Sequence, residues 1–323
     1  MKKYIFLTFS VVIIFIIFLK SISLGNKDSI CEYGDAPIYR FEKEFFEIKQ
    51  DSFDIFFPKI KKKFPYFFSD SSIDFKHEVF LDDTLIQVLD SVNKAFPNLL
   101  TFEETIQQGF CNYKKYFPDS NIEFFTFIDK SFDYRTPVVY ADSKLFISLH
   151  LFLGSTHTFY NFLPDYIKYS HSAEFIPASC FITLAGRHIP YPDVHNFLET
   201  ILHYSKAYLF AQKMLPNTPQ HVLFKCSEEQ IQWCLDNESR IWSYMIEREY
   251  LFSSSMDLVD RFVNLAPFSK FGLPTDSNSP GSVGVWLGLQ IWNAYMDNNN
   301  IPLTELLSET DYIKVLNSSS YKP

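Results

Sequence analysis

Apolar residues recur at helical spacing over several stretches of this chain. In residues 79–96 (VFLDDTLIQVLDSVNKAF) they return every three or four positions, which predicts an amphipathic helix. Its apolar stripe would consist of Leu81, Leu85, Val88, Leu89 and Val92. A second helix is predicted over residues 101–117, where Thr101 and Glu104 form a capping-box pattern at its start.

The centre of the chain shows a strand pattern instead. Residues 123–128 (EFFTFI) and 138–153 (VVYADSKLFISLHLFL) are apolar at consecutive positions, which is typical of two or three strands buried on both faces. Residues 38–41 predict one more short strand. Helical spacing then returns, and further helices are expected over residues 173–184, 194–215, 228–252, 283–296, 303–307 and 311–316. The first of these contains Pro177, which disfavours a helix interior.

These elements together predict an α+β fold that is predominantly helical, with a small central β-sheet packed by helices. No internal repeat and no linker follows residue 36. We therefore expect residues 37–323 to form a single α+β domain.

The N-terminus carries an export signal. Lys2 and Lys3 precede an almost wholly apolar run at residues 4–19, which Lys20 ends. As a helix the run is about 24 Å long, and with residues 21–24 included it reaches about 31 Å, enough to span a bilayer. Lysines before such a run keep the N-terminus cytoplasmic. The sequence thus predicts a signal peptide or N-terminal membrane anchor at residues 1–20, a tether at 21–36, and a body outside the cytoplasm.

Cys31 is the candidate lipidation site, because it follows the apolar run. Asp28, Ser29 and Ile30 stand where a lipoprotein signal has apolar and then small residues, so an uncleaved helical anchor remains the alternative. None of the five cysteines forms a CxxC pair, which argues against a zinc knuckle or a thioredoxin-type motif. A bridge between Cys226 and Cys234 is compatible with their spacing, although buried single thiols are the more common state.

Charge and composition narrow the function classes. The chain has 29 basic and 38 acidic residues, a net charge of −9, whereas a nucleic-acid binder needs a basic surface. Hydrophobic residues make up 47%, enough to bury a core. We attribute the 36 phenylalanines and 19 tyrosines to compositional bias rather than to an aromatic binding box.

Catalytic motifs are absent from the sequence: it contains no HExxH, GxSxG, GxGxxG or P-loop pattern. Glu199 and His203 lie one turn apart on a predicted helix, and that spacing can chelate a metal ion. The same spacing occurs in surface ion pairs, so we predict no catalytic residue, no metal and no cofactor.

The C-terminal third is rich in tryptophan and contains two closely spaced glycines. Gly284 and Gly288 are four residues apart on a predicted helix, where each glycine costs about 1 kcal/mol, so close packing of another backbone on that face is expected. Aromatic residues concentrate binding energy at interfaces. We therefore expect a partner or ligand face at Trp233, Glu238, Trp286 and Trp292.

Several sequence blocks carry a family resemblance. They are YRFEKEFFEI, KFPYFF, VVYADSKLFISLHLFLG, FLPDYI, SEEQIQWCLDNESRIWSYMIEREYLFSSSMDLVDRFVNLAPFSKFG, SPGSVGVWLGLQIWNAYMDNN and SSSYKP. Through them the chain resembles the GldB family of gliding motility lipoproteins of Bacteroidetes over residues 38–323. The resemblance implies a cell-envelope protein needed for surface gliding and linked to type IX secretion, without enzymatic activity. Members usually carry a lipobox cysteine directly after a short signal peptide, and Cys31 departs from that pattern.

The GldB family is in turn distantly similar to predicted zinc proteases of zincin-like fold. On that analogy, residues 197–210 stand where the HExxH helix would be, and Glu238 stands where a third ligand would be. The zinc-binding histidine pair and the catalytic glutamate are missing, and without them no site would lower the pKa of a bound water. The analogy implies a zincin-like scaffold that has lost its metal.

The leading expectation is a non-catalytic, membrane-tethered envelope protein that supports gliding motility, type IX secretion or both, through contacts with other envelope proteins and not with nucleic acid. Two alternatives remain open. One is a divergent zinc metallopeptidase using Glu199, His203 and Glu238. The other is an envelope receptor that binds a small ligand in a cleft between the strands and the helices.

Overall fold

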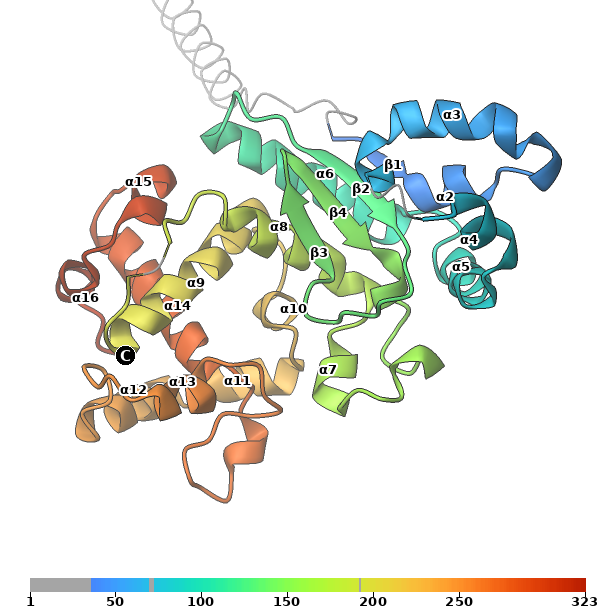
Figure 1. Ribbon diagram of the computed structural model, residues 1–323. Coiled ribbons are helices and arrows are strands. Elements are labelled where there is room, and N and C mark those ends of the chain that lie inside the picture. The colour runs from blue at the N-terminus through green and yellow to red at the C-terminus, as the bar shows by residue number, and fades with distance from the viewer. Residues whose placement is uncertain (1–35, 70–72, 192) are drawn as a thin grey trace, which may run out of the picture. The chain divides into compact units, whose positions relative to one another are not determined.

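The strands form one mixed four-stranded sheet in a computed structural model that describes residues 36–69, 73–191 and 193–323 (Figure 1). They are β1 (Ile38–Arg40), β2 (Glu123–Phe127), β3 (Val138–Ala141) and β4 (Lys144–Ser148), in spatial order β1-β2-β4-β3. β2 runs parallel to β1 and β4, and β3 is antiparallel to β4. Asp142 and Ser143 connect β3 to β4 with φ of 47° and 62°, as a tight hairpin turn requires.

The side chains of the central strands alternate between two hydrophobic cores. Phe124, Leu145 and Ile147 belong to the main core, whereas Phe125 and Phe146 pack into a second core. Successive strand residues point to opposite faces, so both faces of β2 and β4 are covered, as predicted. The edge strand β3 differs, since its Val139 is 40% exposed.

The second core, here called the phenylalanine cluster, forms between β2 and the N-terminal helices α2 (Phe41–Phe46), α3 (Phe53–Lys63) and α4 (Phe75–Leu81). Its buried members are Phe41, Phe45, Ile48, Phe53, Phe64, Phe68, Val79 and Phe125. Phe41 stacks on Phe67 with ring centroids 3.8 Å apart and meets Phe64 edge-on at 5.4 Å. Many of the phenylalanines that the composition shows thus pack against one another.

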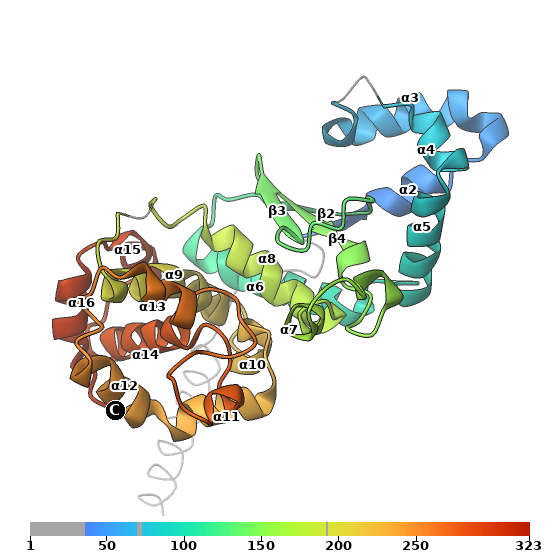
Figure 2. The same cartoon turned by 60° about the horizontal axis from the view of Figure 1, so that its bottom comes forward.

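The main core is helical. α9 (Phe197–Met214) packs against α14 (Val283–Asn298), α8 (Ile176–Ala185) packs on α9, and α16 (Tyr312–Ser319) packs on α14 (Figure 2). The remaining α-helices are α5 (Asp83–Ala95), α6 (Leu100–Tyr116), α7 (Asp165–Tyr169), α10 (Gln220–Phe224), α11 (Glu228–Asp236), α12 (Glu238–Glu247), α13 (Met256–Phe262) and α15 (Leu303–Ser308). An α+β fold that is mainly helical is therefore confirmed.

Two predicted helices are each divided in two. Residues 79–96 span the break between α4 and α5, because the Asp82 carboxylate caps α5 by accepting a hydrogen bond from the Leu85 amide at 3.0 Å. Leu81 is consequently 64% exposed and does not belong to the buried stripe. Residues 228–252 break at Asn237, whose Nδ2 donates to the Trp233 carbonyl at 2.8 Å.

The structure also corrects two helix starts. The capping box expected at Thr101 is wrong, because α6 begins at Leu100 and the Leu100 amide donates to Asn98 Oδ1 at 3.1 Å. A capping box does open α11, between Ser227 and Gln230. Pro177 lies in the first turn of α8, where its missing N–H is tolerated, so it marks the beginning of that helix.

Within the part of the chain that the structure describes, no helix is both long and apolar enough to cross a membrane. The expected signal peptide or anchor at residues 1–20, the tether up to residue 35 and Cys31 lie outside the described residues. Residues 36–323 make up one compact unit by their own contacts. Cys180, Cys226 and Cys234 are free, buried thiols, so Cys226 and Cys234 are not bridged.

Candidate functional site

Gly284 and Gly288 lie where α14 meets neighbouring backbone. A Cβ atom at Gly288 would stand 2.5 Å from the carbonyl oxygen of Ile201 and 2.5 Å from Ser205 Oγ, both on α9. One at Gly284 would stand 2.8 Å from the carbonyl oxygen of Phe262. Both distances are shorter than a side-chain carbon allows. The backbone of α9 therefore approaches α14 closely at Gly288, and the end of α13 does so at Gly284, because these positions lack side chains.

The two tryptophans of α14 belong to this core. Trp286 and Trp292 are both 0% exposed. Their indole N–H groups donate to Gln220 Oε1 at 3.1 Å and to the Leu202 carbonyl at 2.8 Å. The expectation that they form a partner or ligand face is wrong for these two residues, because the ring of each is buried and its one donor is satisfied internally.

The three candidate metal ligands each bond a different partner. Glu199, in the first turn of α9, accepts hydrogen bonds from the His195 amide and from Asn196 Nδ2, both at 2.7 Å. His203 Nδ1 lies 3.1 Å from the Tyr312 hydroxyl, and burial lowers the pKa of this imidazole. Glu238 Oε1 accepts a hydrogen bond from the Tyr321 hydroxyl at 2.7 Å.

These contacts attach α9 and α12 to the C-terminal segment. Lys206, one turn beyond His203, donates from Nζ to the Leu307 carbonyl at 3.1 Å and to the Glu309 carbonyl. Burial lowers the pKa of this ammonium to about 8. Among the described residues, no three His, Cys, Asp or Glu side chains are grouped so that they could hold a metal ion. The polar groups of α9 instead bond α15 and α16.

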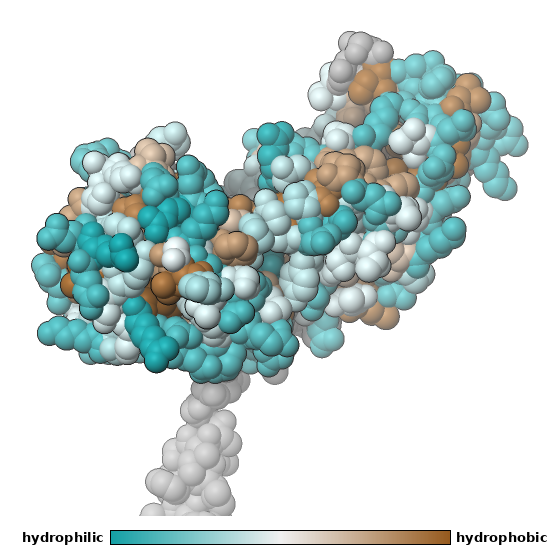
Figure 3. All heavy atoms as spheres, turned by 90° about the horizontal axis from the view of Figure 1, so that it is seen from below, coloured by the Kyte–Doolittle hydropathy of each residue, from teal (hydrophilic) through white to brown (hydrophobic). Residues whose placement is uncertain are grey.

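Trp233 and Glu238 remain accessible on the surface formed by α11 and α12. We call this surface the α11–α12 face and define it by Glu228, Glu229, Trp233, Leu235, Asp236 and Glu238. Trp233 is half-buried against the Phe271 ring at 5.9 Å, and Leu235 is 46% exposed. Figure 3 views the side on which α11 and α12 lie in Figure 1, and hydrophilic residues cover most of it. The face is acidic overall, because its four carboxylates outnumber the neighbouring Arg240, and it has a small apolar centre.

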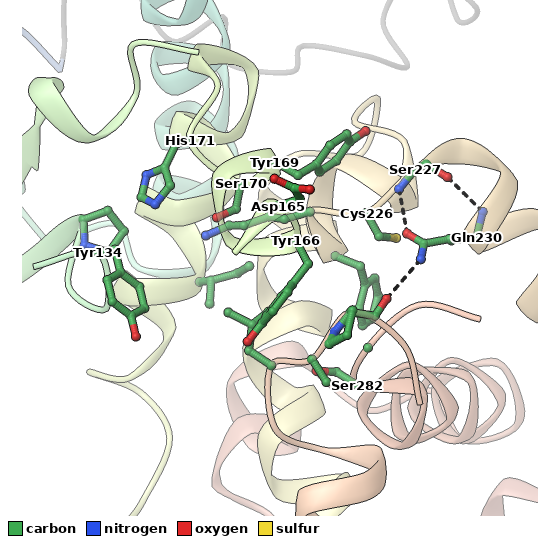
Figure 4. Close-up of a pocket in the computed structure, with 18 of the residues that line it drawn as sticks. Tyr134, Asp165, Tyr166, Tyr169, Ser170, His171, Cys226, Ser227, Gln230 and Ser282 are labelled. Atoms are coloured by element: carbon green, nitrogen blue, oxygen red, sulfur yellow. Dashed lines mark hydrogen bonds between the residues drawn. The ribbon is translucent and has the colours of Figure 1, made fainter. Parts of the chain in front are cut away.

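A cavity of about 570 Å³ lies between α7, the end of α10, the start of α11 and the loops around residues 263–267 and 281–282. Figure 4 shows residues of α7 on one side and Cys226, Ser227 and Gln230 on the other. Tyr166, Tyr169, Tyr208 and Phe224 supply aromatic wall, and Tyr208 stacks on Phe224 at 4.4 Å. None of the candidate site residues expected from the sequence lines this cavity.

Three basic side chains line the cavity: Arg135 at its edge, His171 and Lys225. Lys225, which follows α10 with a φ of 53°, makes no hydrogen bond or ion pair with any residue in the described ranges, and burial lowers the pKa of its ammonium to about 8. His171 donates from Nδ1 to the Leu151 carbonyl, and its buried Nε2 has no hydrogen-bond partner among the described groups. Burial also lowers the pKa of His171, so its ring is neutral at pH 7.

The sequence contains only a weak signal for this site. Lys225 stands between Phe224 and Cys226, immediately before the capping box that opens α11. A lysine between apolar residues at a helix junction indicates partial burial, but the opposite wall comes from residues about sixty positions earlier in the chain, such as Tyr166 and His171. Local spacing could therefore not reveal the cavity.

Comparison with curated protein sequences and with solved structures finds no significant match in either set. A family model described as gliding motility protein GldB does match, over residues 28–323. That range includes both cores, the α11–α12 face and the cavity. Because the match covers most of the chain, the protein belongs to the GldB family of gliding motility proteins.

Proposed function

We propose that this protein is a membrane-tethered component of the cell envelope that supports gliding motility, type IX secretion or both through protein contacts, without catalysing a reaction. The observation that carries the proposal is the family match over residues 28–323. The apolar run at residues 4–19 supports the tether, and the lysines before it favour a periplasmic body.

The α11–α12 face is the contact surface in this proposal. It keeps the two accessible members of the expected partner face, Trp233 and Glu238, whereas Trp286 and Trp292 are buried. Glu228, Glu229 and Asp236 give it a negative charge. A partner that fits this surface presents basic residues around an apolar side chain, because complementary charge steers association and selects partners.

The peptidase alternative has less support. A catalytic zinc site needs several ligands around one ion and an open position for water. Glu199, His203 and Glu238 hydrogen-bond to Asn196, Tyr312 and Tyr321 instead. Their geometry fits helix capping and attachment of the C-terminal segment.

The test is complementation of a strain that lacks the gene. Asp236 lies exposed in the last turn of α11 and, among the described residues, accepts a side-chain hydrogen bond only from Gln232 Nε2, at 2.8 Å. A lysine at this position would suit the helix dipole, so the double variant Leu235→Ser/Asp236→Lys should fold. We expect it to reach wild-type abundance in the envelope but to lose colony spreading, secretion by the type IX pathway, or both.

Asp90→Lys is the matched control, since Asp90 is exposed on α5 and lies outside the α11–α12 face. It should complement fully. If a deletion strain spreads and secretes normally, the proposed function is wrong. If the deletion strain is defective but the double variant restores it as well as the wild type does, the function stands and the contact surface lies elsewhere.

A further inference from the structure

Lys225 lines the cavity, and its ammonium has no paired carboxylate among the described residues. Asp165, a carboxylate that lines the cavity, pairs with Lys168 at 3.1 Å and is almost fully exposed. Arg135, at the cavity edge, pairs with Asp133 at 2.8 Å. No described carboxylate pairs with Lys225, whose pKa is lowered to about 8 mainly by removal from water. An anion that entered the cavity would regain the electrostatic energy that burial removes.

The other titratable groups around Lys225 do not supply that anion. Burial raises the pKa of the Cys226 thiol to about 12 and also raises that of Cys180, so both stay protonated at neutral pH. Burial raises the pKa of Tyr208 to about 12, and burial together with the carboxylates of Glu174 and Glu229 raises that of Tyr169. Neither carboxylate is paired with Lys225, whose pKa is affected by burial and by Cys180. At pH 7 Lys225 therefore carries a positive charge among neutral thiols, neutral phenols and a neutral imidazole.

The other side chains that line the cavity indicate which further groups a ligand would need. The hydroxyls of Tyr134, Tyr166, Tyr169 and Tyr208 have no hydrogen-bond partner among the described residues and can donate or accept. Ile182, Phe224, Val263 and Leu265 provide apolar surface. A cavity of about 570 Å³ is within the size range of small-molecule sites.

We infer that this cavity binds a small organic carboxylate with an apolar body, its carboxylate against Lys225 Nζ and its body against the aromatic wall. A single ammonium matches a single negative charge. A phosphate dianion would need further donors or charges, and the remaining basic side chain, Arg135, already pairs with Asp133. This site is independent of the α11–α12 face and of the proposed contact function.

Isothermal titration calorimetry on residues 28–323, which contain the whole compact unit, tests the inference. The probes are octanoate, 3-phenylpropionate, uncharged 1-octanol and inorganic phosphate. We expect saturable binding of at least one carboxylate at one per chain, and much weaker binding of 1-octanol. Lys225→Met should weaken carboxylate binding about ten- to a hundredfold, as loss of a charge-assisted hydrogen bond does. Lys115→Met, at an exposed position on α6, is the control and should bind as the wild type does.

The pH dependence separates a direct charge contact from a structural role of Lys225. Because only the protonated amine attracts a carboxylate, affinity should fall about tenfold between pH 7 and pH 9 in the wild type and stay constant in Lys225→Met. Lys225→Arg keeps the charge and should keep the preference for octanoate over 1-octanol.

Four results would overturn the inference. They are equal binding of octanoate and 1-octanol, unchanged affinity in folded Lys225→Met, binding of phosphate in place of the carboxylates, and no saturable binding of either carboxylate. Circular dichroism of each variant establishes folding before the titration. None of these results bears on complementation by Leu235→Ser/Asp236→Lys, so the two proposals fail separately.

Discussion

Replacing Gly288 by alanine would add one methyl group at the closest approach of α9 and α14. The new Cβ atom would lie 2.5 Å from the Ile201 carbonyl oxygen, which belongs to helical backbone and cannot rotate away as a flexible side chain could. One helix must therefore shift, which also strains the nearby bond from Trp292 Nε1 to the Leu202 carbonyl, now 2.8 Å long. Overpacking of this kind costs up to about 3 kcal/mol.

Two smaller terms nearly cancel each other. Alanine gains about 1 kcal/mol over glycine in a helix interior, and a weakened buried hydrogen bond loses about 1 kcal/mol. We therefore expect Gly288→Ala to lower the free energy of unfolding by about 2–3 kcal/mol. Gly186→Ala is the control, because Gly186 is exposed at the end of α8, its φ is −56°, and the nearest atom to a new Cβ is 3.4 Å away. That change should be neutral or stabilise by about 0.5 kcal/mol.

Urea unfolding of residues 28–323, followed by far-ultraviolet circular dichroism, measures both variants against the wild type. The two free energies should differ by about 3 kcal/mol in the stated order. Equal stability of Gly288→Ala and Gly186→Ala would refute the close contact between the α9 and α14 backbones.

Three further substitutions test single side chains by the same unfolding assay. Burial lowers the pKa of His188 to about 4, so the folded state is most stable above pH 6.5 and loses stability as pH falls towards 4. Because solvent reaches the half-buried ring and screens its charge, His188→Phe should remove on the order of 1 kcal/mol of this acid sensitivity, with exposed His77→Phe as the control. Tyr321→Phe should lower the free energy of unfolding by about 1–2 kcal/mol at pH 7, because the Glu238 carboxylate loses its hydrogen-bond donor. An unchanged urea midpoint would contradict the 2.7 Å hydrogen bond. Lys225→Met should raise the free energy of unfolding at pH 7 by up to about 3 kcal/mol, because the folded state holds a charged amine whose pKa burial lowers to about 8. A lower free energy of unfolding would argue against an unpaired ammonium.

The sequence predicts most elements of this fold because their hydrophobic patterns are local. The expected helix at residues 194–215 corresponds to α9 (Phe197–Met214), and the one at 283–296 to α14 (Val283–Asn298). The patterns miss breaks made by single polar residues. Asp82 and Asn237 interrupt otherwise continuous apolar spacing, and a side-chain hydrogen bond to backbone, which periodicity does not record, fixes each break.

The site is less predictable than the fold, for reasons that particular residues show. The i, i+4 pair Gly284 and Gly288 indicates a close approach because glycine in a helix needs a compensating contact. Trp286 does not distinguish a core from an interface, since both favour a large ring with a satisfied donor. The surroundings of Lys225 depend on α7 and on loops remote in sequence, so its burial follows only from the tertiary structure.

The phenylalanine cluster has a consequence for how the protein opens. Most of its members lie between Phe41 and Val79, so it is assembled from neighbouring segments and contacts the rest mainly through one face of the sheet. Such a segment can unfold as its own cooperative unit while the main core stays intact. Opening would uncover Phe125 and Phe146 on adjacent parallel strands, a flat aromatic surface suited to self-association. Amide hydrogen exchange should therefore be faster in α2–α4 than in α9 and α14, and this partial opening, rather than global unfolding, would set the rate of aggregation.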